Sequence, residues 1–370
     1  MRAALFREPG RPLAVAEIDT AAPGPGEVLV ATAAAGLCHS DIHLLDGKIP
    51  IAAPAVLGHE ASGVVVDVGP GVTRVVPGDH VIACLSAFCG KCALCLRGET
   101  WLCQDKQAIQ RTAALPPRLA LPDGTAVGAN AGVGGLAERM LLHENAVVAI
   151  TKDMPLDLAA IVGCAVTTGV GAAFNTADIR AGETVAVIGC GGVGLNIVQG
   201  ARLRGAGRVV AVDLLEAKRD LARSVGATDA AEGDPVAAVS ALTGGLGADH
   251  VFDAVGSPAT SAQALAMTRP GGTVYVVGIG GMAATVEIPG YALWGQGKTV
   301  RGVHMGSNNF TVDMPRYVDL YLQGRLHLDE LVSRRITLDE VNEGYDALRG
   351  GETARSIVVF PDPREASATA

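Results

Sequence analysis

The hydrophobic pattern of the chain changes in character near Gly182. Before that point, short β-branched runs bounded by Gly, Pro or Asp predict a β-rich region with frequent turns. After it, strand-like apolar runs alternate with helix-like stretches, which indicates a parallel sheet covered on both faces. The predicted strands are 27–32, 63–69, 80–84, 184–188, 208–212, 250–255 and 273–278, and the predicted helices are 193–203 and 214–225.

Three further segments extend this pattern. The sequence of 104–135 shows no regular hydrophobic pattern and predicts a long loop. The twenty uncharged residues 158–177 are about as long as a bilayer span. The latter are mostly Ala, Gly, Thr and Val, so we expect a buried helix and loop. The tail beyond Gly306 should pack back on the first domain, and residues after Pro361 should be frayed.

Composition excludes several classes of protein. At 370 residues the chain can form two domains, and its 48 glycines imply many tight turns. The net charge of −9 argues against a nucleic-acid or anionic-membrane surface. Glu8 and Pro9 interrupt the N-terminus before any apolar core develops, so no export signal is visible and we expect a soluble cytoplasmic protein without membrane or nucleic-acid partners.

Four cysteines lie within fifteen residues, at Cys89, Cys92, Cys95 and Cys103. Four thiolates on such short loops can close a tetrahedron around one Zn²⁺, as in structural zinc sites. Disulfides fit poorly with a reducing compartment. An iron–sulfur cluster is the alternative, although its bacterial spacing has a shorter last gap followed by proline. We therefore predict a structural zinc that performs no chemistry itself.

A glycine motif, G-x-G-x-x-G, directly follows the strand predicted at 184–188. Gly189 should make the tight turn, Gly191 should let the backbone approach a pyrophosphate, and Gly194 should let helix and strand pack closely. The amides of Gly192 and Val193 would face the phosphates. Asp213, at the end of the next strand, would bind the adenosine ribose, and Leu214 and Leu215 supply no arginine for a 2′-phosphate. These features favour NAD.

Three separate segments carry the remaining candidate chemistry: 36–43 with Cys38, 58–69 with the Gly-His59-Glu60 motif, and 163–169 with Cys164. With the four-cysteine lobe and the glycine motif, they make the whole chain resemble the zinc-dependent alcohol dehydrogenases of the medium-chain dehydrogenase/reductase family. The resemblance implies an α/β fold: a Rossmann-type doubly wound parallel sheet domain plus a β-rich GroES-like catalytic domain. The implied boundaries are 1–166 and 305–370 for the catalytic domain and 167–304 for the NAD-binding domain.

The resemblance also implies roles for individual residues. Cys38, His59 and Cys164 would hold a catalytic Zn²⁺ with an open fourth position, which makes two zinc ions per chain. Asp41 would orient the ligand histidine, Glu60 would approach the metal during ligand exchange, and Ser40 would accept the substrate proton and pass it through the cofactor ribose to His43. The implied cofactor contacts beyond the glycine motif and Asp213 are His39, Thr168, Lys218, Val277, Ile279 and Arg355.

The implied activity is reversible hydride transfer between NAD and a primary alcohol or aldehyde. Ile49, Leu85, Leu102, Leu136 and Ile279 are expected to line an apolar pocket suited to hydrophobic or aromatic substrates. Glutathione-dependent relatives carry charged residues where this chain has Ile49 and Gln107, whereas a mycothiol-dependent formaldehyde dehydrogenase remains an alternative. A non-catalytic zinc- and nucleotide-binding relative is the alternative from another class. The family is usually dimeric or tetrameric, so a homodimer or homotetramer is expected.

Overall fold

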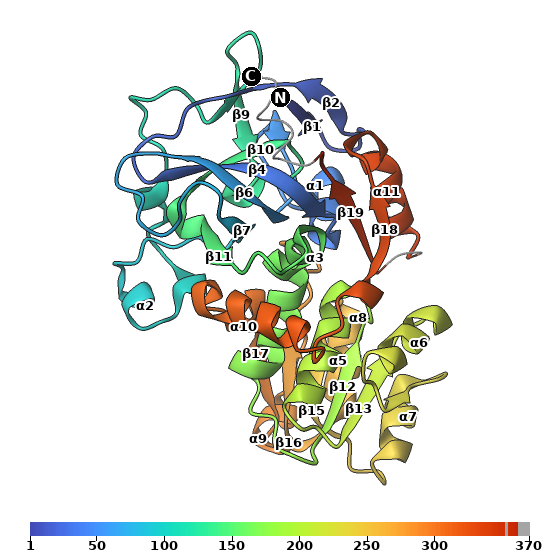
Figure 1. Ribbon diagram of the computed structural model, residues 1–370. Coiled ribbons are helices and arrows are strands. Elements are labelled where there is room, and N and C mark those ends of the chain that lie inside the picture. Colours follow the sequence, from blue (N-terminus) through green and yellow to red (C-terminus); the bar gives the residue numbers. More distant parts are fainter. Residues whose placement is uncertain (352–353, 362–370) are drawn as a thin grey trace. The chain divides into compact units, whose positions relative to one another are not determined.

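The computed structural model describes residues 1–351 and 354–361, and the chain forms two compact units (Figure 1). The first unit contains Met1–Cys164, Asn309–Gly324 and the chain from Val332 onward, and the second contains Ala165–Asn308 and Arg325–Leu331. The tail therefore returns to the first unit, as the sequence predicts. The short segment Arg325–Leu331 differs from the predicted boundaries, because it joins the second unit. The prediction of a frayed end after Pro361 falls outside the described residues.

The first unit is built on two sheets. Among its described residues, one sheet has the order β2-β1-β5-β9-β8-β3, and the other has the order β11-β7-β6-β4-β19-β18 with β10 also paired to β4. Strand β4 (Glu27–Gly36) pairs antiparallel with β6 (Glu60–Val68), so the chain segments that follow β4 and precede β6 meet at one end of this pair. An apolar core that includes Leu5, Val30 and Leu136 lies between the elements of this unit.

The bounds of the other first-unit elements follow in chain order. The strands are β1 (Arg2–Phe6), β2 (Ala14–Glu17), β3 (Asp19–Thr20), β5 (Ala55–Val56), β7 (His80–Ala83), β8 (Leu119–Ala120), β9 (Ala126–Ala129), β10 (Arg139–His143), β11 (Val147–Ile150), β18 (Val332–Ile336) and β19 (Arg355–Val359). The helices are α1 (His39–Leu45), α2 (Ala93–Leu96), η1 (Thr100–Leu102), η2 (Lys106–Ile109), η3 (Asn130–Gly132), η4 (Glu144–Ala146), α3 (Leu156–Ile161), α10 (Phe310–Leu322), η9 (Leu338–Glu340) and α11 (Val341–Arg349). The predicted loop 104–135 thus contains only short elements.

The second unit is a parallel sheet with the order β14-β13-β12-β15-β16-β17 among its described residues. Numbered from its first strand, this is the 3-2-1-4-5-6 order of the Rossmann fold. The strands are β12 (Thr184–Ile188), β13 (Arg208–Val212), β14 (Asp229–Ala230), β15 (Ala248–Asp253), β16 (Thr268–Val276) and β17 (Thr299–Gly302). The helices are α4 (Thr167–Gly171), η6 (Ala172–Thr176), α5 (Gly192–Leu203), α6 (Glu216–Ser224), α7 (Pro235–Leu242), α8 (Pro258–Met267), α9 (Gly290–Trp294), η7 (Met305–Ser307) and η8 (Asp329–Leu331). The predicted fold class is confirmed.

The apolar segment that resembles a membrane span is a helical stretch, Leu156–Thr176, formed by α3, η5 (Val162–Val166), α4 and η6. By length and composition it could cross a bilayer, but 89% of its most apolar window is buried inside the structure. The π-helical turn η5 interrupts it, and a second π-helical turn, η6, ends it. Such turns often mark functional positions in helices, and the first of them carries Cys164.

Candidate functional site

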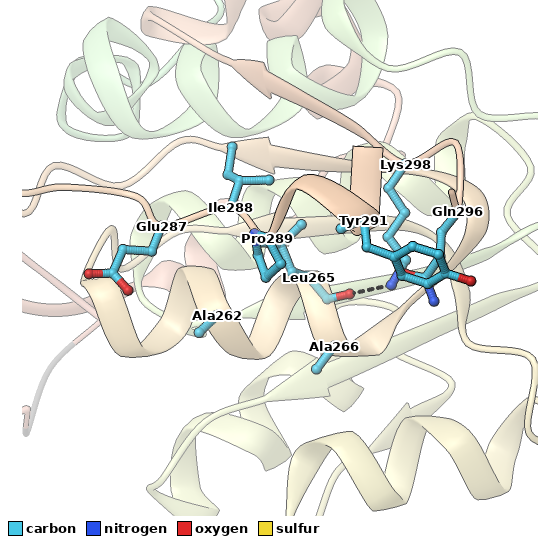
Figure 2. Close-up of a pocket in the computed structure, with 10 residues that line it drawn as sticks. Ala262, Leu265, Ala266, Glu287, Ile288, Pro289, Tyr291, Gln296 and Lys298 are labelled. Carbon is cyan, nitrogen blue, oxygen red and sulfur yellow. Dashed lines mark hydrogen bonds between the residues drawn. The ribbon is translucent and has the colours of Figure 1, made fainter. Parts of the chain in front are cut away.

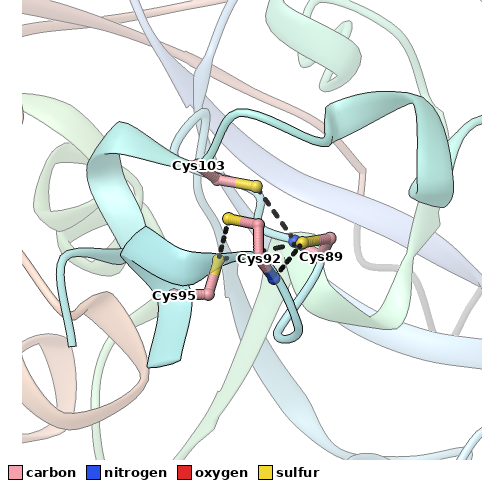
Figure 3. A group of neighbouring side chains, drawn as sticks. All are labelled: Cys89, Cys92, Cys95 and Cys103. Carbon is pink, nitrogen blue, oxygen red and sulfur yellow. Dashed lines mark hydrogen bonds between the residues drawn. The ribbon is translucent and has the colours of Figure 1, made fainter. Parts of the chain in front are cut away.

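The four cysteines of the lobe converge on one point (Figure 3). Their Sγ atoms all lie within 4.8 Å of one another, with 3.9 Å between Cys89 and Cys95 and 3.5 Å between Cys92 and Cys95. These separations are far longer than the bond of about 2.05 Å that a disulfide requires. The described cysteines are all free thiols. The donor set and its compactness therefore fit one tetrahedral Zn²⁺ and do not fit disulfides.

Backbone N–H groups of this lobe donate hydrogen bonds to the cysteine sulfur atoms. The N–H of Cys89 donates to Sγ of Cys103 over 3.2 Å, and the N–H of Cys92 donates to Sγ of Cys89 over 3.3 Å. Hydrogen bonds from the backbone, with that of Cys95 first, lower the pKa of the Cys92 thiol to about 6. Because zinc binds thiolate, this shift favours metal binding near neutral pH.

The second group of candidate ligands consists of Cys38, His59, Glu60 and Cys164, whose donor atoms also lie within 4.8 Å of one another. Cys38 follows β4 as the N-cap of α1, His59 directly precedes β6, and Cys164 lies in η5. All four residues are buried. Three segments that are distant in the sequence therefore meet at one site. The resemblance to a known family implies this meeting, whereas the spacing of the residues along the chain could not show it.

Glycines next to these residues make the convergence possible. A Cβ at Gly36 would lie 2.3 Å from Oε2 of Glu60, and one at Gly163 would lie 2.9 Å from the carbonyl oxygen of Ala83. Gly58 has φ of +84°, and a Cβ there would lie 2.9 Å from the backbone nitrogen of Leu136. A side chain at any of the three positions would push a ligand-bearing segment away from the cluster.

Polar neighbours surround the candidate ligands. The Ser40 hydroxyl lies 3.2 Å from Sγ of Cys38 and 3.3 Å from Nε2 of His59. On the other side of the ring, Nδ1 of His59 lies 3.1 Å from Oδ1 of Asp41, which is fully buried. Asp41 thus accepts from Nδ1, and Nε2 is directed toward the cluster and available to a metal.

Glu60 and Arg355 form a buried ion pair beside the cluster, with 3.1 Å between Nη2 and Oε1. Arg355 is 3% exposed, and its guanidinium also lies 3.5 Å from the carbonyl of Leu37 and 3.9 Å from Sγ of Cys38. Burial raises the pKa of Glu60 to about 8, although the Arg355 cation opposes the rise. The predicted pyrophosphate contact of Arg355 stays a prediction, because in this structure the guanidinium is occupied inside the first unit.

The hydrogen bond between the two buried thiols shifts their pKa values in opposite directions, and it raises the pKa of the Cys164 thiol well above its usual range. The side-chain hydrogen bond with Cys164 lowers the pKa of the Cys38 thiol well below its usual range, against the opposing effect of burial. Burial lowers and the Asp41 carboxylate raises the pKa of His59, and the raising effect prevails. Two thiols, one imidazole held by a carboxylate and a serine hydroxyl fit a zinc ion that keeps an open position.

The two other histidines of this region lie on α1. His39 is exposed and His43 is half-buried, one helical turn further along. The predicted roles of His39 at the pyrophosphate and of His43 in the proton relay stay predictions. Leu136, expected in the substrate pocket, is instead a fully buried member of the first unit's core.

The glycine motif of the second unit has the geometry of a dinucleotide-binding loop. Gly189 has φ of +88°, and a Cβ at Gly194 would lie 1.8 Å from the carbonyl oxygen of Gly189. A Cβ at Gly191, in contrast, would meet no atom of the described structure within 4 Å. Gly192 begins α5, so free amides point from the helix start into the space in front of Gly191. The loop therefore fits a pyrophosphate.

Asp213 lies directly after β13, where the motif requires an acidic residue. Its Oδ2 accepts from the N–H of Cys190 over 2.8 Å, and its Oδ1 accepts from the N–H of Leu215 over 3.0 Å. Arg219 donates to the carbonyls of Asp213 and Leu214 over 2.8 and 3.2 Å, so this arginine fixes the loop backbone. The predicted ribose contacts of Asp213 and Lys218, which is half-buried on α6, stay predictions.

The remaining predicted cofactor contacts differ in exposure. Thr168 is 7% exposed, and its hydroxyl donates to the sulfur of Met305 over 3.4 Å. Val277 is buried after β16, and Ile279 is 52% exposed. The cofactor contacts predicted for these residues and for Val193 stay predictions.

Sequence reasoning missed three polar residues. Asn130 and Tyr345 both hydrogen-bond the Asp41 carboxylate, each over 3.0 Å. Asp253 is fully buried at the end of β15, where it accepts from the N–H groups of Val255 and Gly256. None of them lies in a motif, and only the folded chain brings Asn130 and Tyr345 to Asp41, which is 89 and 304 positions away from them.

A surface groove of about 570 Å³ lies at α8 and α9 (Figure 2). It is lined by Ala262, Leu265, Ala266, Glu287, Ile288, Pro289, Tyr291, Ala292, Gln296 and Lys298. None of the predicted site residues lines it, and the amine of Lys298 is engaged with the carbonyl of Leu265 over 2.8 Å. The groove is therefore not the candidate active site.

Comparison with known proteins agrees with this geometry. Residues 24–152 match the alcohol dehydrogenase GroES-like domain, and residues 192–323 match the zinc-binding dehydrogenase domain. "Putative alcohol dehydrogenase D" of Mycobacterium tuberculosis is 43% identical, covering 96% of this chain and 99% of the relative. S-(hydroxymethyl)glutathione dehydrogenase of Paracoccus denitrificans is 36% identical, covering 97% and 99%.

Among solved structures, benzyl alcohol dehydrogenase of Acinetobacter calcoaceticus has a TM-score of 0.91 at 32% identity, covering 97% of this chain and 99% of the other. Identity and coverage at this level extend over both units, not over the nucleotide-binding fold alone. The non-catalytic alternative is therefore not supported. The chain belongs to the zinc-dependent alcohol dehydrogenases of the medium-chain dehydrogenase/reductase family and is an oxidoreductase of that type.

Proposed function

We propose that this protein is an NAD-linked dehydrogenase that interconverts a primary alcohol carrying a hydrophobic or aromatic group and its aldehyde. The observation that carries the proposal is the buried group of Cys38, His59 and Cys164 with the Ser40 hydroxyl beside it. A zinc ion bound there would act as a Lewis acid that makes an alcohol more acidic, and a bound NAD would be the hydride acceptor.

The chain's own residues would prepare that reaction. Oγ of Ser40, 3.3 Å from Nε2 of His59, can take up the substrate proton and pass it away from the buried cluster. The Asp41 carboxylate fixes the tautomer of His59 by accepting from Nδ1. The Arg355 cation lies 3.9 Å from Sγ of Cys38 and favours the thiolate form of that residue. The site combines a proton acceptor with a preorganised ligand set.

The loop after β13 supports NAD over NADP. A ribose 2′-phosphate would approach the Asp213 carboxylate, which repels it. Leu214 is 98% exposed and brings no charge to this position, and the guanidinium of Arg219 is engaged with two backbone carbonyls. Asp213→Ala should therefore reduce the ratio of kcat/KM with NAD to kcat/KM with NADP, mainly by weakening NAD binding.

A thiol-adduct formaldehyde dehydrogenase is the second candidate. The 36% sequence identity with the Paracoccus denitrificans enzyme, whose name describes a hydroxymethyl-glutathione substrate, supports this second candidate. Ile49 is a partly buried apolar residue packed against the first unit's core, and Gln107 is exposed and uncharged. Neither carries a charge that could pair with the charged groups of a glutathione adduct, so mycothiol is the thiol to test.

The deciding experiment is a panel of alcohols and aldehydes assayed with NAD and NADP, following the absorbance of the reduced cofactor. Turnover of benzyl alcohol with NAD alone supports the proposal. Oxidation of formaldehyde only when mycothiol is added, with no turnover of simple alcohols, would establish the second candidate instead. His59→Ala should abolish either activity and remove one zinc per chain.

We also propose that the protein is a homodimer or homotetramer. Tyr291, Leu293 and Trp294 on α9 are 59%, 44% and 80% exposed, which is unusual for apolar side chains grouped on one short helix. Light scattering coupled to gel filtration tests the proposal, and a monomeric mass at micromolar concentration would contradict it.

A further inference from the structure

We infer that Tyr345 and Asn130 are positioning residues for the catalytic zinc site, which they serve by fixing the carboxylate that holds His59. The inference rests on the proposed function, because it assigns a task to these residues in the same metal site. It concerns side chains that no motif of the sequence singles out.

Asp41 is fully buried and accepts three hydrogen bonds from side chains. Its Oδ1 lies 3.1 Å from Nδ1 of His59 and 3.0 Å from Nδ2 of Asn130. Its Oδ2 lies 3.0 Å from the hydroxyl of Tyr345. Three elements therefore meet at this carboxylate, since Asp41 lies on α1, Asn130 in η3 and Tyr345 on α11.

These hydrogen bonds have different consequences for the two oxygens. A buried carboxylate is costly unless it is paired or hydrogen-bonded, and an ionised carboxylate can accept about four hydrogen bonds. The Tyr345 hydroxyl holds Oδ2, which prevents the carboxylate from rotating about its last bond. Oδ1 is thereby kept toward Nδ1 of His59, and the imidazole keeps the tautomer that leaves Nε2 for the metal.

The backbone is shaped to bring both donors to Asp41. Gly344, beside Tyr345, packs so closely on the chain before Cys38 that a Cβ there would lie 2.6 Å from Cδ1 of Leu37. This close approach lets α11 reach the end of β4. Ala131, directly after Asn130, has φ of +53°, a left-handed conformation that residues with a side chain rarely adopt.

The tyrosine ring itself is 2% exposed, so its hydroxyl cannot turn to water instead. Tyr345→Phe removes only that hydroxyl and preserves the packing of the ring. Oδ2 of Asp41 would then lose the one side-chain donor that residues 1–351 and 354–361 give it. Because partners of ligand histidines commonly change metal affinity 10- to 100-fold, we expect Tyr345→Phe to weaken zinc binding at this site about tenfold.

The four-cysteine site provides an internal reference in the same molecule. It shares no residue with the Asp41 hydrogen bonds, so its zinc should be retained equally by the wild type and by Tyr345→Phe. Tyr275→Phe is the matched control variant. Tyr275 is 3% exposed in the second unit, and its hydroxyl lies 3.0 Å from Nδ1 of His250, so this variant loses a comparable buried hydrogen bond.

The experiment measures zinc release from the purified holoenzyme to a colorimetric chelator over a range of chelator concentrations. His59→Ala identifies which of the two zinc ions belongs to the catalytic site, because that variant should lack it. We expect the catalytic zinc to be released at about tenfold lower chelator concentration in Tyr345→Phe, with a similar change in Asn130→Ala. The other zinc and both zincs of Tyr275→Phe should behave as in the wild type.

The inference is overturned if Tyr345→Phe and Asn130→Ala release their catalytic zinc like the wild type, even if both unfold at lower temperature. An equal loss in Tyr275→Phe would also overturn it, because general destabilisation would then explain the effect. Failure of the proposed function is a separate result. A protein that binds two zincs but oxidises no alcohol would still test Tyr345, since zinc release does not depend on turnover.

Discussion

Substitution by alanine should have different effects at two glycines of the nucleotide loop. At Gly194 it should lower stability, and at Gly191 it should weaken NAD binding. At Gly194, an added Cβ would lie 1.8 Å from the carbonyl oxygen of Gly189, whereas real Cβ contacts essentially never fall below 3.0 Å. The start of α5 would have to move away from the loop. At Gly191, the added Cβ would meet nothing within 4 Å, and φ of −82° suits alanine.

The magnitudes follow from these distances. Alanine in a helix gains up to about 1 kcal/mol over glycine, but overpacking costs about 1–3 kcal/mol and more when backbone must move. We therefore expect Gly194→Ala to destabilise the second unit by about 2 kcal/mol or more. Gly191→Ala should leave stability within about 0.5 kcal/mol of the wild type. Its methyl group would instead occupy the space that a pyrophosphate needs and weaken NAD binding about tenfold or more.

Thermal unfolding and fluorescence titration with NAD measure the two effects, and each variant is the control for the other. The reasoning is refuted if Gly194→Ala is as stable as the wild type, because the close approach would then be wrong. It is equally refuted if Gly191→Ala binds NAD with unchanged affinity, since the open space would then not be the pyrophosphate site.

Three other changes test separate parts of the molecule. Cys92→Ser should cost one zinc per chain and lower the unfolding temperature, with activity falling only as a consequence; retention of two zincs by metal analysis would contradict the structural site. Glu27→Gln should cost about 2–4 kcal/mol in chemical denaturation, because the buried Glu27 carboxylate pairs with both Arg111 and Arg118. Burial by itself would raise the pKa of Asp249, but hydrogen bonds from the Thr184 amide and the Arg269 guanidinium have the larger effect, so the pKa lies below its usual value of 3.8. The stability that Asp249 contributes is thus present at neutral pH and is lost progressively as the pH falls below 3.8, so Asp249→Asn should destabilise at pH 7 and progressively less at lower pH.

Much of the second unit could be predicted from the sequence because its signals are local. The strand at 184–188 coincides with β12, and the helix predicted at 193–203 begins one residue earlier as α5. Here the turn, the helix start and the acidic residue follow one another within thirty residues. The glycines are required by the close packing of backbone, and the acidic residue is required for hydrogen bonds to a ribose. The helix predicted at 214–225 is shorter, because Leu214 and Leu215 precede α6.

The four-cysteine lobe could also be predicted from local sequence, because its four thiols lie within fifteen residues of chain and come within 4.8 Å of one another in a compact loop. The other metal cluster was not. Cys38 and Cys164 are 126 positions apart in the chain, and each alone is an ordinary small buried residue. Only resemblance to a family suggested that they meet with His59.

The sequence by itself determined the parallel sheet, the dinucleotide loop and the thiol lobe, because spacing along the chain is enough to specify them. The tertiary structure alone decided which buried polar groups meet: Arg355 against Glu60, and Tyr345 and Asn130 against Asp41. These pairs depend on close approaches at glycines such as Gly36 and Gly344, which no local pattern reveals. Long-range packing, and not propensity, therefore sets the surroundings of the ligand histidine.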